Sequence, residues 1–140
     1  MSDSAHLVPI GYINIAWGWV TMVVGIIMGS GLGMYAFAGP LKAPKGHEDY
    51  TSLPRRLFRL AHIAFVALPM ISIMYGQHID AAHLADSYKH FGSRAMLVGM
   101  IGVPVLLIGA AFYNPIKYLE VVPVSAVLVA LVLIAWGYLF

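Results

Sequence analysis

His62 is the residue whose position in the sequence offers the most chemistry. It follows a basic stretch containing Arg55, Arg56 and Arg59 and lies within a long apolar run. An ionisable side chain at membrane depth is costly, and it is usually either functional or paired. A neutral imidazole can ligate haem iron, bind a quinone oxygen or relay a proton. We therefore expect His62 and Arg59 to help bind a b-type haem or a quinone. The alternative is a histidine hydrogen-bonded to a backbone carbonyl across the bundle.

A second group of histidines, His78, His83 and His90, occurs further along the chain with Asp80 and Asp86 between them. His78 ends one apolar segment and His90 precedes the next, so a short loop could place both rings at one depth, as in a bis-histidine b-type haem site. His78, Asp80 and His83 could instead hold a divalent metal through imidazole and carboxylate. Their spacing matches no strong metal motif, and solvated histidines near lipid headgroups are the third alternative.

Gly25, Gly29 and Gly33 recur at every fourth position of an apolar segment. On a helix, glycine at this spacing forms a flat groove that lets another helix approach closely. We expect these glycines to pack helices within one bundle, or to dock a partner subunit or a flat cofactor.

Four apolar helices are needed to position these residues. A helix that spans the bilayer takes about 20 mostly apolar residues, and the segments that qualify are residues 12–37, 54–78, 91–113 and 121–140. The last segment is rich in β-branched residues, but an apolar run of this length must satisfy its backbone internally, as a helix does. We predict an all-α integral membrane protein, a four-transmembrane-helix bundle with short loops, in which residues 1–140 form a single domain.

The composition excludes several classes of function. Hydrophobic residues make up 61% of the chain and charged residues 10%, against about a quarter charged in soluble domains. The absence of cysteine excludes disulfides, zinc-thiolate sites, iron–sulfur clusters held by this chain and thiol catalysis. No basic face with interleaved aromatic residues indicates a nucleic-acid partner. No acidic residue falls within a predicted span, which argues against a proton- or sodium-coupled transporter. We expect no catalytic activity from the chain on its own.

The distribution of basic residues predicts an orientation. Four spans place both termini on one side and the first and third loops, 38–53 and 114–120, on the other. The side of these two loops carries Lys42, Lys45, Arg55, Arg56, Arg59 and Lys117, whereas the opposite side carries only Lys89 and Arg94. Because cytoplasmic loops are enriched in Lys and Arg, the first and third loops are expected in the cytoplasm. Both termini and loop 79–90 would then lie outside, in what we expect to be a bacterial inner membrane.

The arrangement is similar in general style to the small cytochrome-b-like anchor subunits of respiratory complexes, which are also short helical bundles with a few histidines near helix ends. This resemblance is one of architecture. It implies a small membrane subunit of a larger respiratory electron-transfer complex, contributing to a haem b or quinone site and contacting other membrane subunits and lipid. The alternatives are a structural or assembly subunit without a cofactor, and a small channel or transporter.

Overall fold

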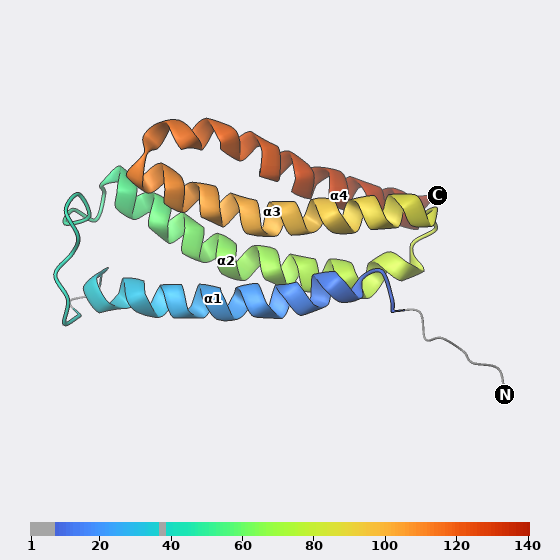
Figure 1. The fold of residues 1–140 in the computed structure, drawn as a ribbon, viewed down its shortest axis with the longest axis horizontal. Coiled ribbons are helices and arrows are strands. Elements are labelled where there is room, and N and C mark those ends of the chain that lie inside the picture. Colours follow the sequence, from blue (N-terminus) through green and yellow to red (C-terminus); the bar gives the residue numbers. More distant parts are fainter. Residues whose placement is uncertain (1–7, 37–38) are drawn as a thin grey trace.

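Four long helices form an antiparallel bundle in the computed structural model, which describes residues 8–36 and 39–140 (Figure 1). They are α1 (Tyr12–Ala36), α2 (Leu53–His78), α3 (Asp86–Phe112) and α4 (Val121–Leu139). Two short 3-10 helices, η1 (Ile79–Ala81) and η2 (Asn114–Glu120), lie in the connections, and the described residues contain no strand. Each long helix is apolar enough and long enough to cross a membrane. The predicted fold class is confirmed.

The helix boundaries differ from the predicted spans mainly in α3. This helix begins at Asp86, whereas the apolar run suggested a start near residue 91. Its first turns are polar, and counting apolar residues does not detect a polar helix start. The connection between α2 and α3 is correspondingly shorter than the predicted loop 79–90. Phe37 and Ala38, where the first span was expected to give way to the first loop, lie outside the described residues.

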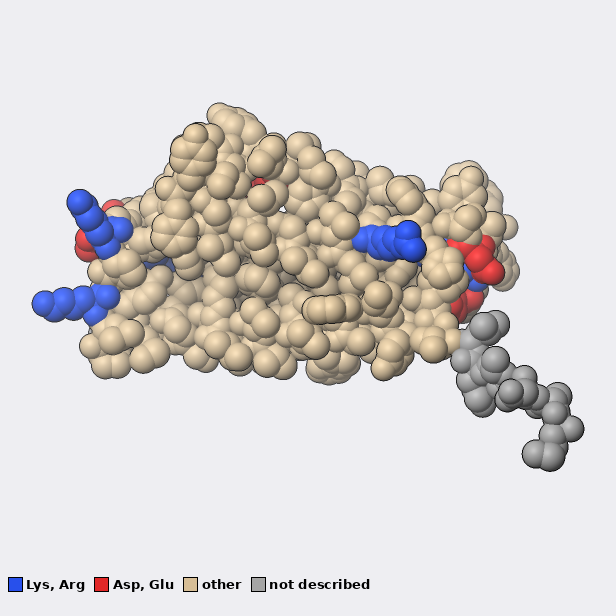
Figure 2. Space-filling model, viewed as in Figure 1, with Lys and Arg blue, Asp and Glu red and all other residues tan. Residues whose placement is uncertain are grey.

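Neighbouring helices in the sequence are also neighbours in space. α1 packs on α2, α2 on α3 and α3 on α4, and α1 also touches α3. The start of α1, the connection between α2 and α3 and the C-terminus lie at one end of the bundle, and the first and third loops lie at the other (Figure 1). Most charged side chains gather at these two ends, leaving the flank almost entirely uncharged (Figure 2).

The contact between α1 and α2 depends on glycine. A Cβ atom placed on Gly25 would stand 2.7 Å from the carbonyl oxygen of Phe65, and one on Gly18 would stand 2.5 Å from Cγ1 of Ile73. Such distances leave no room for a methyl group, so both glycines allow the backbone of α1 to lie directly against α2.

Of the predicted glycine row, Gly25 and Gly29 lie in this contact, whereas Gly33 has no described atom within 4 Å of the position that its Cβ would take. Gly18 and Gly11, which directly precedes α1 and meets the backbone of Gly76, extend the contact towards the start of the helix instead. Gly11, Gly18 and Gly25 are seven residues apart, the spacing that keeps one face of a helix against its neighbour in left-handed packing.

A buried polar cluster joins three of the helices. Asn14 of α1 is fully buried, and its amide nitrogen donates to the carbonyl oxygen of Ser93, 3.0 Å away on α3. The Ser93 hydroxyl donates to the Asn14 side-chain oxygen, and the Ser72 hydroxyl of α2 donates to the Asn14 carbonyl oxygen at 3.3 Å. Asn14 thus bridges the helices. Because lipid offers no substitute partner, this cluster holds α1, α2 and α3 in one register.

The glycine contact predicts a clear difference between two alanine variants of α1. Gly25→Ala should lower the free energy of unfolding by about 1–3 kcal/mol, because the new methyl group overlaps the backbone of Phe65. Gly31→Ala is the matched control, since Gly31 lies on the same helix and no described atom outside the helix backbone lies within 4 Å of the position that its Cβ would take. It should be neutral or should stabilise the helix by up to about 1 kcal/mol. Reversible SDS-induced unfolding in mixed micelles measures both, and equal stabilities for the two variants would contradict this packing.

Candidate functional site

A partly enclosed pocket of about 250 Å³ lies between α1 and α2, near the end of the bundle that carries the first loop. Its wall combines apolar surface with the polar groups of one histidine, two arginines and one tyrosine. The lining residues are Gly29 and Leu32 of α1, Tyr50 of the first loop, and Arg55, Arg59, His62 and Ile63 of α2. Convergence of a few polar groups on an apolar pocket is the usual form of a small-molecule site.

His62 is held in a defined orientation in this pocket. It lies about 14 Å along α2 from the start of the helix. Its Nδ1 is 3.1 Å from the carbonyl oxygen of Gly25. Because a carbonyl can only accept, Nδ1 carries the hydrogen, and Nε2 of the neutral ring keeps its lone pair. The ring lies against Gly29, where any side chain would overlap it. His62 therefore makes the carbonyl contact considered from the sequence and still has one nitrogen for a ligand.

Arg59 places a positive charge at the mouth of the pocket. Its guanidinium carbon lies 3.9 Å from the centre of the Tyr50 ring, a stacking contact that fixes the group. In the part of the chain that the structure describes, no carboxylate forms an ion pair with Arg59. The site therefore presents an unneutralised cation beside an apolar wall, which favours a ligand with oxygen acceptors.

Arg55 has a different role, because it holds the first loop against α2. It is buried, and its Nη1 donates to the carbonyl oxygens of His47 and Glu48 at 3.4 and 3.3 Å. His47 is also buried, with its ring 5.2 Å from that of Phe58. These contacts hold the loop against α2 and so carry Tyr50 to the pocket.

A short turn beside Tyr50 supports the same loop. The Thr51 hydroxyl donates to Asp49 Oδ2 at 2.6 Å, and the Thr51 N–H donates to Oδ1 at 3.1 Å. Hydrogen bonds from the Thr51 hydroxyl and then from its backbone lower the pKa of Asp49. Asp49, which is charged at neutral pH in any case, therefore stays charged to more acidic pH than an ordinary aspartate and keeps this turn formed.

The three arginines that precede His62 lie in two settings: Arg55 holds the first loop, whereas Arg56 and Arg59 line an open groove beside the pocket. A second, more open groove of about 400 Å³ adjoins the pocket and shares Tyr50, Arg59 and Ile63 with it. Arg56, which is exposed, lines this groove together with Leu60. The structure thus brings His62 and Arg59 together.

No family model, curated protein or solved structure matches this chain. Its function therefore has to be argued from the side chains of the site.

His78 lies at the opposite end of α2 and in a different surface. Its Nδ1 donates to the carbonyl oxygen of Met74 at 2.7 Å, and its own carbonyl accepts from the Tyr138 hydroxyl at 3.1 Å. It lines an apolar groove of about 340 Å³ between α2 and α4, and His90 is not among the residues of that groove. His90 is exposed on α3. His78 and His90 therefore share no pocket in which they could bind one haem together, as their predicted pairing would require.

Asp80 caps the start of α1. Its two carboxylate oxygens accept the backbone N–H groups of Ile10 and Gly11, each at 3.0 Å, and its carbonyl accepts from Lys89 Nζ at 2.8 Å. A carboxylate at a helix N-terminus also interacts favourably with the helix dipole. The sequence did not reveal this role, because the partner backbone lies far away in the chain.

The metal site expected from His78, Asp80 and His83 is not assembled. Within residues 8–36 and 39–140, no three His, Cys, Asp or Glu side chains lie close enough to hold a metal ion. The physical reason is that Asp80 uses both of its oxygens on α1, while the exposed His83 is anchored through its backbone N–H, 2.8 Å from the carbonyl of Gly137.

Tyr50 is the residue of the site that sequence reasoning missed. It occurs in a polar, irregular segment, and no periodicity connects that segment with α1 or α2. The only available signal was its position just before the arginines of α2, since arginine commonly stacks on aromatic rings.

Proposed function

We propose that this chain is a small membrane subunit that binds a quinone or its quinol between α1 and α2, as part of a larger electron-transfer complex. The observation that carries the proposal is the pocket in which His62, Arg59 and Tyr50 meet an apolar wall. A quinone has a flat ring, carbonyl oxygens that accept hydrogen bonds and an apolar tail, and it reaches its sites through the bilayer.

The two polar ends of the site suit the two forms of such a ligand. Nε2 of His62 keeps a lone pair, so it can accept the hydroxyl hydrogen of a quinol. The Arg59 guanidinium can donate to a quinone carbonyl or stabilise negative charge that develops on that oxygen. His62 can thus take one of the two protons that leave when a quinol gives its two electrons to the neighbouring redox centre, while Arg59 and the ring of Tyr50 orient the head group.

A b-type haem fits the described residues less well than a quinone. The pocket of about 250 Å³ suits the single ring of a quinone head group, whereas the haem macrocycle joins four rings. Its lining contains one imidazole and no methionine, whereas six-coordinate b and c haems take two axial ligands. His78 and His90 do not line one groove either. Of the two ligands expected from the sequence, we therefore propose the quinone rather than the haem.

The partners follow from the composition of the chain. A quinone exchanges electrons with a redox centre, and this chain lacks the cysteines that would hold an iron–sulfur cluster. The proposal therefore assigns the electron carrier to a neighbouring membrane subunit. A structural or assembly subunit without a cofactor remains the alternative, and it predicts no quinone binding.

The proposal includes an orientation in a bacterial inner membrane. Lys42, Lys45, Arg55, Arg56, Arg59 and Lys117 all lie at the end of the bundle formed by the first and third loops. The positive-inside rule favours the cytoplasm for that end. The quinone pocket would then open near the cytoplasmic face.

Quinone binding should depend on His62 and Arg59. We expect a short-chain benzoquinone to bind the detergent-solubilised protein, and His62→Gln and Arg59→Gln each to raise its Kd about tenfold, since each removes a hydrogen bond to a charged or strongly polar partner. Equilibrium dialysis with the labelled quinone measures the effect.

Two matched variants control for the loss of a histidine or a cation elsewhere. His90→Gln removes an exposed histidine at the other end, and Lys117→Gln removes an exposed cation outside the pocket. Both should bind the quinone as the unmodified protein does. Failure of the unmodified protein to bind, or equal weakening in the controls, would favour the structural subunit.

The orientation can be tested by single-cysteine labelling, because the chain has no cysteine of its own. In intact cells, a membrane-impermeant maleimide should label Ser87→Cys and leave Lys45→Cys unlabelled until the membrane is opened. The reverse pattern would invert the proposed orientation.

A further inference from the structure

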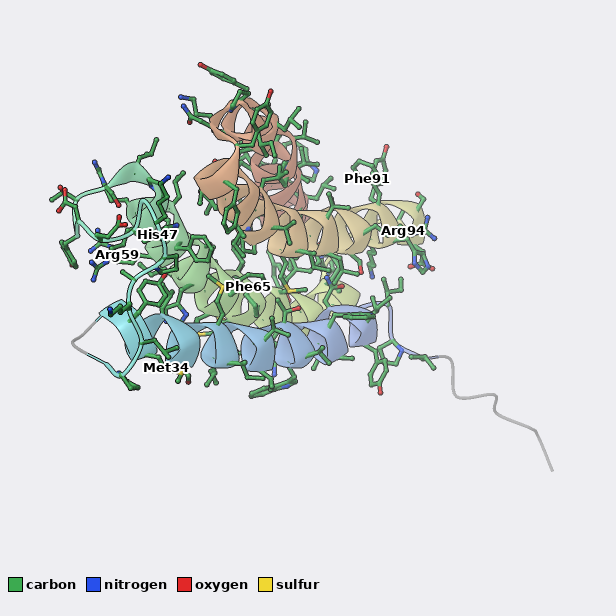
Figure 3. All side chains as sticks on the ribbon, turned by 60° about the vertical axis from the view of Figure 1, so that its left-hand side comes forward. Met34, His47, Arg59, Phe65, Phe91 and Arg94 are labelled. Carbon is green, nitrogen blue, oxygen red and sulfur yellow. The ribbon has the colours of Figure 1, made fainter. Side chains whose placement is uncertain are left out.

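Arg94 is a charged residue that the quinone proposal does not use. It is exposed on α3, about 12 Å along the helix from its start at Asp86. Figure 3 shows it near the end of α3 that lies away from the first loop, on the same helix as Phe91. It forms no hydrogen bond or ion pair with any residue that the structure describes.

This cation lines an apolar groove between α3 and α4. The groove has a volume of about 440 Å³, and its walls include Phe91 and Val98 of α3 and Ala126 of α4. A Cβ placed on Gly99 would stand 2.9 Å from the carbonyl oxygen of Pro123, so α3 and α4 lie in close contact at this level. Val122 also lines the groove, which therefore runs along α3 from the level of Phe91, past Arg94, to the level of Val98. The part between Arg94 and Val98 leads away from the helix start and towards the middle of the bilayer.

The combination of cation and groove matches one class of ligand. An arginine in the first turns of a membrane span can extend its long side chain to the interface, where it needs an anion, and bilayer phosphates are the anions present there. The apolar groove leading inward from the arginine has the direction that an acyl chain takes below its headgroup. A partner's carboxylate could satisfy the charge, but it would leave the groove unexplained.

We infer that Arg94 and the groove between α3 and α4 bind an anionic phospholipid of the bilayer, with its phosphate on the guanidinium and one acyl chain along Val98 and Ala126. Ser125, which also lines the groove, adds a hydroxyl that can donate to an ester oxygen. This site is formed by helices other than those of the quinone pocket and does not depend on it.

The test measures which phospholipid remains bound to the whole chain. The protein is reconstituted in vesicles of equal parts phosphatidylglycerol and phosphatidylcholine, extracted in mild detergent and analysed by native mass spectrometry. We expect the unmodified protein to retain phosphatidylglycerol preferentially, and Arg94→Gln to reduce that preference about fivefold, as expected for one interfacial cation. Lys117→Gln, which removes one charge at the other end of the bundle, should retain the preference.

A second variant tests the groove without changing its charge. Ala126→Phe fills the space for the acyl chain and should reduce retention of phosphatidylglycerol while Arg94 is intact. Inorganic phosphate added during extraction should not compete if the acyl chain contributes. An unchanged lipid preference in both Arg94→Gln and Ala126→Phe would overturn the inference. So would loss of a co-purifying protein subunit from Arg94→Gln with its lipid retained, because a partner's acid would then hold Arg94.

Discussion

The close approach of α1 to α2 through glycine is the constraint on which the candidate site depends. Gly18 and Gly25 let the backbone of α1 lie directly against Ile73 and Phe65 of α2. In lipid there is little hydrophobic force between helices, so this packing and interhelical hydrogen bonds must supply the stability. Asn14 adds those hydrogen bonds to α2 and α3. Together these contacts fix both the distance and the register of the two helices that form the pocket.

The chemistry of His62 follows from that register. Only with α1 this close can the carbonyl of Gly25 accept from Nδ1, and only with a glycine at position 29 can the imidazole come this close to α1. The helix contact therefore selects the tautomer and leaves the lone pair on Nε2. The loop is fixed separately, by Arg55 on the carbonyls of His47 and Glu48, and it brings Tyr50 under Arg59. Packing, hydrogen bonding and charge thus converge on one small volume near one end of the bundle.

The sequence predicted what is local and missed what depends on distant partners. The four helices were predicted because a long apolar run is a property of each segment alone. His62 was found for the same reason, as a lone polar residue in such a run. Gly33 was grouped with Gly25 because sequence spacing alone does not show which face of α1 meets α2. The capping role of Asp80 was not predictable, because the N–H groups of Ile10 and Gly11 approach it only after folding.

Photoaffinity labelling of the membrane-embedded protein with an azido-quinone, followed by mass-spectrometric mapping of the labelled residues, would locate the quinone on the chain. The account predicts label on Tyr50 and Ile63, with competition by unlabelled quinone. Label confined to the groove of His78 and Tyr138, or spread along the exposed flank without competition, would contradict a quinone site between α1 and α2.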